Sequence, residues 1–430
     1  MTEENLREKL LKKTGAEIGD NIRIKKDDGR VYEGILMPHH EFSNRDVIVL
    51  KLKNGYNIGV KVSEGTEMQV LAKREKTKQK AARTVPYDSK KPTVSVLGTG
   101  GTIACYVDYR TGAVYPATTA EDLAFSVPEV FDVCNINARV VLQILSENIT
   151  VENWQTLAKE IAEEFNKNKA NGVVVPHGTD TMGYTSAALS FMLKNLTGPV
   201  VLVGAQRSSD RPSSDAAQNL LDAATVAANS DIGEVVVVMH GEISDSFTAI
   251  HRGTKVRKMH TSRRDAFQSI NSDLIGRVSD GNIRIISDYT RKATGRVEVD
   301  AAMEKDVAMV YFYPDMKPED IPSKKGIVLV GTGLGHVSKP LYSKIKELIE
   351  KGSTVVMTSQ CIHGRVNMNV YATGRDLLKL GVIPGEDMLP ETAYVKLMWV
   401  LAHAKNQEEI RKLMLTNIAG EISERTIYND

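Results

Sequence analysis

The sequence predicts two α/β domains with parallel sheets, preceded by a small β-barrel domain of SH3-like scale. Short strand candidates separated by hairpin signals fill the first 75 residues. From Thr93 onwards, continuous apolar runs alternate with helical stretches, and a second such alternation begins near residue 306. Continuous apolar runs are typical of strands that a parallel sheet buries on both faces.

The composition is that of a globular protein. The 430 residues are 42% apolar and 25% charged, and the net charge of +1 argues against broad phosphate coverage by this chain. Cys105, Cys134 and Cys361 are far apart and odd in number, so we expect reduced thiols in a cytoplasmic protein. No apolar run is long enough to span a bilayer, and the first residues lack the apolar core of a signal peptide.

The front part, residues 1–75, begins with a short helix over residues 1–14. Asp28-Gly29 and Asn54-Gly55 are hairpin signals between its five strand candidates, which are NIRIKK, VYEGILMP, VIVLKLKN, GYNIGVKV and EMQVLAK. Residues 76–92 are polar and basic. They are interpreted as a solvated linker or, alternatively, as a segment that contacts phosphate.

The large α/β domain is expected over residues 93–290. Its strand candidates are TVSVLG, GVVVPHG, VVLVGAQ and EVVVVMHG. Polar residues without a clear core, from about 279 to 305, separate it from a smaller C-terminal α/β domain over residues 306–430, with the strand candidates AMVYFYP, GIVLVGTG and STVVMTSQ. Ligands of such sheets bind at the carboxyl ends of the strands, so the turns there are the candidate sites.

The turn GTGGTIA follows the first of these strands and matches no phosphate-binding template. It lacks the lysine of a P-loop and the third glycine of a dinucleotide fingerprint, and the later GTGLGH lacks that glycine too. Glycines such as Gly101 let backbone N–H groups approach a substrate, and Thr102 is a nucleophile candidate that needs a nearby base. The alternative is a tight turn without chemistry.

A second turn with polar residues, in VVVPHGTDTMG, places Thr179 and Asp180 at the same sheet edge as Thr102. His177 precedes them. We expect it to be buried and hydrogen-bonded, because no G-x-S-x-G elbow accompanies it. The histidines show no metal-ligand spacing, so no metal is expected.

Four motifs together resemble the bacterial-type L-asparaginase family from about residue 93 to the C-terminus, which implies an asparaginase-like fold. They are GTGGTIA, HGTDT, the run VGAQR to DAAQNLLDA, and KMHTSRRDAFQSIN. The resemblance implies that Thr102 attacks a side-chain amide and that Thr179, Asp180 and Lys258 form a proton relay. A lysine acts as a base only where burial lowers its pKa. Without the resemblance, this lysine would be read as a solvated residue of a basic run.

The resemblance also implies the substrate-binding groups. Ser146, Glu147 and Asp180 would hold the α-carboxylate and α-ammonium groups of the substrate, beside the glycine turn with Gly101. Residues 105–118 would form a lid whose tyrosine assists catalysis. Tyr106, Tyr109 and Tyr115 qualify, and Tyr115 has the expected spacing. His336 stands where the family has a polar residue that reaches a neighbouring protomer.

The front part is similar to the N-terminal domain of archaeal glutamyl-tRNA(Gln) amidotransferase D subunits, on GDNIRIKKDDGRVYEGILMPHHEF and LKLKNGYNIGV. This resemblance covers essentially the whole chain. It implies a glutaminase that takes L-glutamine and feeds ammonia to a partner, the E subunit, which binds Glu-tRNA(Gln) and uses ATP and magnesium. No cofactor is expected in this chain. A homodimer of it, with two copies of each subunit in the complex, is expected.

Two alternatives remain. The first is a free L-asparaginase with an accessory N-terminal domain. The second is an RNA-binding module, made of the barrel and the basic segment, on an inactive α/β scaffold. The near-zero net charge and the lack of aromatic residues within the basic run argue against the second.

Overall fold

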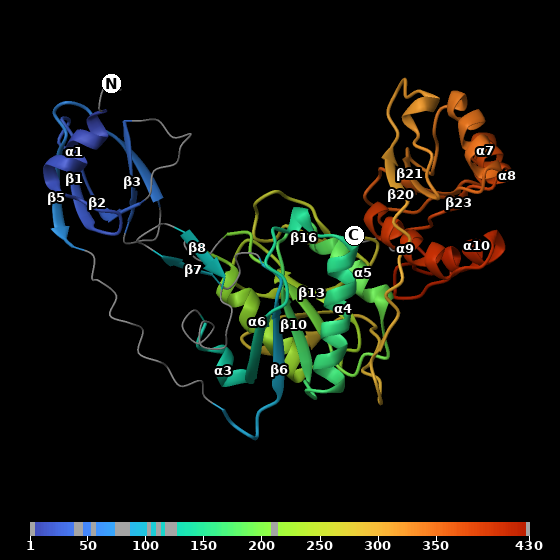
Figure 1. Cartoon of the computed structure of the whole chain (residues 1–430), viewed down its shortest axis with the longest axis horizontal. Coiled ribbons are helices and arrows are strands. Elements are labelled where there is room, and N and C mark those ends of the chain that lie inside the picture. The colour runs from blue at the N-terminus through green and yellow to red at the C-terminus, as the bar shows by residue number, and fades with distance from the viewer. Residues whose placement is uncertain are drawn as a thin grey trace.

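The structure is a computed structural model, which describes residues 5–37, 46–52, 57–73, 87–100, 105–108, 113–116, 127–207 and 214–426. For residue 57 and for residues 105–108 and 113–116 it describes the backbone alone. Figure 1 shows the chain coloured from the N-terminal β domain in blue to the C-terminal α/β domain in red.

The N-terminal part is a helix and a five-stranded antiparallel sheet in the order β4-β3-β2-β1-β5. These elements are α1 (Leu6–Thr14), β1 (Asn21–Lys25), β2 (Val31–Leu36), β3 (Val47–Lys51), β4 (Asn57–Lys61) and β5 (Glu67–Ala72). Alternate side chains, such as Ile22 and Ile24 of β1, form its core. At the predicted Asp28-Gly29 turn, Gly29 has a φ of 82°. The second predicted turn, Asn54-Gly55, lies outside the described residues.

The large domain is built on an eight-stranded sheet in the order β18-β17-β14-β13-β12-β10-β6-β9. The strands are β6 (Thr93–Gly98), β9 (Asn135–Val140), β10 (Gly172–Pro176), β12 (Val200–Val203), β13 (Val235–His240), β14 (Thr248–Arg252), β17 (Gly276–Ser279) and β18 (Asn282–Ile285). The five strands from β9 to β13 in this order are parallel. Four of these five, β6, β10, β12 and β13, are the predicted strands, whereas β9 was not among the strand candidates. The other three are antiparallel additions. The sheet is therefore mixed, and β18 lies where the sequence indicated no clear core.

Helices cover both faces of this sheet (Figure 1). They are α4 (Val151–Asn166) and α5 (Met182–Met192) on one face, and α3 (Val130–Val133) and α6 (Ala216–Asn229) on the other. Consecutive strand residues point to opposite faces, so Val173 and Val175 pack with α4 and α5, whereas Val174 packs with α6. This two-sided burial explains the continuous apolar runs.

The smaller domain has a four-stranded parallel sheet with helices on both faces. Its elements are β20 (Val307–Tyr311), β21 (Gly326–Gly331), β22 (Thr354–Ser359), β23 (Ile383–Pro384), α7 (Tyr342–Glu350), α8 (Ala372–Leu380), α9 (Pro390–His403) and α10 (Gln407–Leu415). Helices α7 and α8 pack on one face, and α9 covers the other. One hydrophobic cluster contains side chains of α4, α5 and α9, so the two α/β domains share a core.

The remaining elements are short paired strands and 3₁₀ turns. They are β7 (Cys105–Asp108), β8 (Ala113–Pro116), β11 (Leu193–Lys194), β15 (Val256–Lys258), β16 (Phe267–Ser269), β19 (Glu298–Val299), η1 (Ser146–Asn148), η2 (Pro318–Asp320) and η3 (Lys339–Leu341). The antiparallel pair β7–β8 falls within the predicted lid. Among the helices of the described residues, none is long and apolar enough to cross a membrane.

Candidate active site

The first glycine turn leaves the sheet at the carboxyl end of β6. The Thr99 hydroxyl donates a hydrogen bond to the Pro176 carbonyl at 2.9 Å, which joins the turn to the end of β10. Gly100 has a φ of 98°, and a Cβ atom there would lie 2.2 Å from the Ile144 carbonyl oxygen. Both observations require glycine at this position. The next residues, Gly101 and Thr102, lie outside the described residues, so their predicted roles stay predictions.

The second turn, which follows β10, packs directly against Ser146. A Cβ atom on Gly178 would lie 2.7 Å from the Cβ and Oγ atoms of Ser146, so only glycine allows this approach. The Thr181 hydroxyl donates to the Ser146 carbonyl at 2.7 Å. Ser146 is buried, whereas Glu147, the next residue of η1, is exposed. Sequence reasoning missed Thr181, although it is the third polar residue of the same turn.

Lys258 connects two of the predicted catalytic residues. Its Nζ atom donates to Thr179 Oγ1 at 2.8 Å and to Asp180 Oδ1 at 2.8 Å. The lysine side chain is 17% exposed and that of Asp180 is 68% exposed. The contacts with the hydroxyl and the carboxylate are short enough for direct proton transfer. The interpretation of this lysine as a solvated residue of a basic run is wrong, because its amine contacts the turn that follows β10.

His177 lies inside the domain rather than in the candidate site. Its side chain is buried, and its Nδ1 atom lies 2.6 Å from the Gly178 carbonyl oxygen. Burial lowers the pKa of His177 to about 4, so the ring is neutral near pH 7. The predicted state, buried and hydrogen-bonded, is confirmed.

The two remaining predicted contributions come from the lid and the smaller domain. Tyr109 lies outside the described residues, and the structure describes the backbone alone for Tyr106 and Tyr115. His336 follows β21. Its ring packs edge-on against Tyr371 with centroids 5.6 Å apart, and its Nδ1 atom lies 3.3 Å from the Thr373 hydroxyl. A contact of His336 with a neighbouring protomer stays a prediction.

Within the part of the chain that the structure describes, no three His, Cys, Asp or Glu side chains come together as a metal site. The side chains brought together at the candidate site carry hydroxyl, carboxylate and amine groups. Thr179, Asp180 and Lys258 contact one another, and Ser146 packs against the same turn.

Comparisons with known proteins show the family of the chain. Three family models match the chain: the GatD N-terminal domain over residues 16–71, the N-terminal asparaginase domain over residues 93–291, and the glutaminase/asparaginase C-terminal domain over residues 306–414. Among solved structures, the thermostable L-asparaginase from Thermococcus kodakarensis is 35% identical with a TM-score of 0.70, covering 77% of this chain and 100% of that one. L-asparaginase I from Vibrio cholerae is 30% identical with a TM-score of 0.68, covering 77% and 99%.

Curated relatives match over nearly the whole chain. The glutamyl-tRNA(Gln) amidotransferase D subunit from Pyrococcus furiosus is 55% identical, with 98% of each chain covered. The D subunits from Thermococcus kodakarensis and Methanopyrus kandleri are each 51% identical, covering 98% and 96% of this chain and 98% and 93% of their own. The chain belongs to the family of glutamyl-tRNA(Gln) amidotransferase D subunits, whose catalytic part has the asparaginase fold.

Proposed function

We propose that this chain is the glutaminase subunit of an ATP-dependent amidotransferase that converts Glu-tRNA(Gln) to Gln-tRNA(Gln). One observation carries the proposal. Lys258 Nζ bridges Thr179 and Asp180 at the sheet edge where the GTGGTIA turn begins, in a chain whose full-length relatives are D subunits. A relay of this kind suits the hydrolysis of a side-chain amide.

The proposed reaction has two steps. In the first, the Thr102 oxygen attacks the side-chain carbonyl of L-glutamine, a C–O bond forms, and the C–N bond breaks. Thr179 and Lys258 carry the proton from the attacking hydroxyl to the leaving ammonia. Backbone N–H groups of the glycine turn, including that of Gly101, stabilise the oxyanion. In the second step, water hydrolyses the ester and releases glutamate.

The substrate's α-carbon groups are assigned to the turn beside this relay. The Ser146 hydroxyl would donate a hydrogen bond to the α-carboxylate. The carboxylates of Glu147 and Asp180 would face the α-ammonium group. Both acidic side chains are exposed in the structure, which leaves them accessible to a ligand. The β7–β8 hairpin, with Tyr115, would close over the substrate and exclude water.

The partner is proposed as the E subunit of the amidotransferase, which would bind Glu-tRNA(Gln) and use ATP and magnesium to activate the glutamyl group. This chain has no P-loop in its sequence and is assigned no cofactor. We place the complex in the cytoplasm, with two copies of each subunit around a homodimer of this chain. The alternative of a free L-asparaginase accounts for less of the chain, since the solved asparaginases cover 77% of it.

The test is to measure glutamate release from glutamine by the chain alone, with the E subunit, and with the E subunit plus Glu-tRNA(Gln). The proposed function predicts weak hydrolysis by the isolated chain and marked stimulation in the full mixture. Equal rates in all three mixtures, with asparagine preferred over glutamine, would instead support the free asparaginase.

A further inference from the structure

Residues 252–258, which we call the linking segment, run from the end of β14 to Lys258. Arg252 fixes the first end within the large domain, since its Nε atom donates to Glu234 Oε2 at 2.8 Å. Lys258 lies at the other end, in the candidate active site. Between these ends, three residues contact the smaller domain or the C-terminal residues that follow it.

Thr254 makes the first of these contacts. Its hydroxyl donates to the Ala419 carbonyl at 3.0 Å, and its own carbonyl accepts from the Thr392 hydroxyl, on α9, at 2.8 Å. Thr254 and Thr392 are both buried. The backbone of the linking segment is therefore hydrogen-bonded directly to α9.

Lys255 makes the second contact. Its Nζ atom lies 2.7 Å from Asp387 Oδ2, and the two side chains are 1% and 2% exposed. Asp387 also accepts from the Ser423 backbone N–H at 3.0 Å, in the C-terminal segment. Burial lowers the pKa of Lys255, and the Asp387 carboxylate opposes this effect. A buried ion pair of this kind holds its two segments in one relative position, because separating the charges inside the protein is costly.

Arg257 makes the third contact, one residue before the catalytic candidate. Its Nη2 atom lies 3.2 Å from Glu391 Oε1, in the first turn of α9, and the side chains are 26% and 15% exposed. Consecutive side chains of a strand point to opposite faces. In β15, Arg257 therefore faces α9 while Lys258 faces Thr179, so a shift of one side chain displaces the other through their shared backbone.

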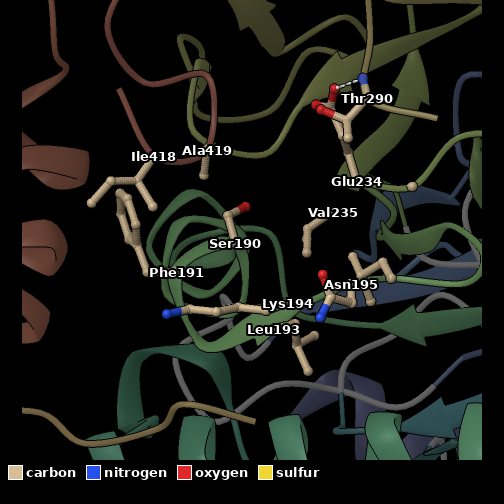
Figure 2. A pocket seen from close by; sticks show the side chains of 12 residues that line it. Ser190, Phe191, Leu193, Lys194, Asn195, Glu234, Val235, Thr290, Ile418 and Ala419 are labelled. Atoms are coloured by element: carbon tan, nitrogen blue, oxygen red, sulfur yellow. Dashed lines mark hydrogen bonds between the residues drawn. The ribbon is translucent and has the colours of Figure 1, made fainter. Parts of the chain in front are cut away.

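Figure 2 shows the cavity near the first end of the linking segment. Its volume is about 250 Å³, and Glu234, Ile418 and Ala419 are among the residues that line it. Glu234 accepts from the Thr290 backbone N–H as well as from Arg252. Ile418 and Ala419 thus line the cavity, and the Ala419 carbonyl also accepts the hydrogen bond from Thr254. The cavity therefore lies next to the Arg252 end of the linking segment. At the Lys258 end, the contacts are made by α9 and Asp387.

We infer that Glu391 and Asp387 of the smaller domain are positioning residues for Lys258, acting through Arg257 and Lys255. They touch no reacting atom. Their carboxylates hold the linking segment so that the Lys258 amine stays within hydrogen-bonding distance of Thr179 and Asp180. The smaller domain thereby controls the relay within its own chain. This inference rests on the proposed amide hydrolysis and adds to it the residues that align the relay.

The test uses the full-length chain with the E subunit and follows glutamate release by Glu391→Gln, which keeps the size of the side chain and removes its charge. A displaced catalytic group lowers the rate of the chemical step, so we expect kcat to fall by about tenfold to a hundredfold. KM should change less than kcat, because Ser146 and Glu147 lie on another segment and, among the proposed substrate-binding groups, Lys258 contacts Asp180. The matched control is Lys194→Gln, which removes the Lys194–Asp300 pair without touching the linking segment. It should keep the wild-type kcat.

To distinguish an effect through Lys258 from a general effect on the fold, Glu391→Gln is repeated in a Lys258→Ala background. If Glu391 acts through Lys258, Glu391→Gln should lower kcat hardly at all in the Lys258→Ala background. A wild-type kcat for folded Glu391→Gln, or an equal loss in both backgrounds, would overturn the inference. If Glu391→Gln does not fold, Arg257→Gln decides in the same way, since it removes the other partner of the same ion pair. An inactive wild-type complex would contradict the proposed function rather than this inference.

Discussion

The Lys258 amine donates hydrogen bonds to both Thr179 and Asp180. Single and double substitutions of these residues can therefore test the relay. Because Thr179 and Lys258 share one proton path, removing either should disable the same step. We predict that Thr179→Val combined with Lys258→Ala lowers kcat little more than the worse single variant. Steady-state glutamine hydrolysis by the three variants measures this. Losses in kcat that multiply would show that the two residues act independently.

Two buried histidines should make the folded protein sensitive to acid. Burial lowers the pKa of His177 to about 4 and that of His251 to about 3, whereas the unfolded value is about 6.5. The unfolded chain therefore binds more protons, so the stabilising contribution is complete above about pH 6.5 and is lost as the pH falls towards 4. Each histidine should account for about 2 kcal/mol of unfolding free energy between pH 7 and pH 5.

Urea unfolding at pH 7 and pH 5 measures this dependence. His177→Gln and His251→Gln should each reduce the difference between the two pH values, whereas His363→Gln, at an exposed position, should leave it unchanged. If all three variants behave alike, other groups are responsible for the acid sensitivity.

The sequence predicted several site residues but not the contacts that hold their segment in place. Thr179, Asp180 and Lys258 were found through motifs that resemble a known family, and the structure brings all three together. The ion pair between Lys255 and Asp387 was not foreseen. The two residues are far apart in the sequence, and a lysine in a basic run looks solvated until the tertiary structure supplies a buried carboxylate.

Among the elements, α4 begins directly after the η1 turn that carries Ser146 and Glu147. Thr150 caps it in a capping box with Asn153, in which each side chain accepts from the other's backbone N–H. Thr150→Ala should lower the unfolding free energy by about 1 kcal/mol.

Thr156 offers a matched control on the same helix. It is exposed, and its hydroxyl donates to the Glu152 carbonyl within the helix. Thr156→Ala should be neutral or slightly stabilising, since alanine is the better helix former. Chemical unfolding of both variants gives the comparison, and equal effects would mean that the cap contributes nothing specific.

Most of the parallel strands could be predicted because each one is a continuous apolar run, but β9, with the sequence NINARV, alternates polar and apolar residues and was missed. The antiparallel strands β14, β17 and β18 escaped prediction for a physical reason. β14 and β17 mix polar with apolar residues, and β18 is largely exposed, so no continuous apolar run marks any of them. β14 pairs with β13, β17 with β14, and β18 with β17, and strand formation depends on such neighbouring strands more than on the local residue pattern.

At the scale of the whole molecule, the C-terminal segment is tied to α9 by an ion pair between Lys396 and Glu421, both 0% exposed. Lys396→Met would leave the Glu421 carboxylate buried without its cation. We predict a loss of about 3 kcal/mol in unfolding free energy. Thermal unfolding of the full-length chain checks this, with the exposed-pair variant Lys346→Met as the control. An unchanged melting temperature for Lys396→Met would show that the pair contributes no net stability.

The central claim is that this chain supplies ammonia to a second active site. Thr102→Ala in the complex with the E subunit tests it most directly, because it removes the proposed nucleophile and leaves the partner untouched. The measurement is Gln-tRNA(Gln) formation with either glutamine or an ammonium salt as the nitrogen source. We predict that glutamine-dependent formation is abolished and that ammonium-dependent formation continues at the wild-type rate. Undiminished glutamine-dependent formation by this variant would contradict the account.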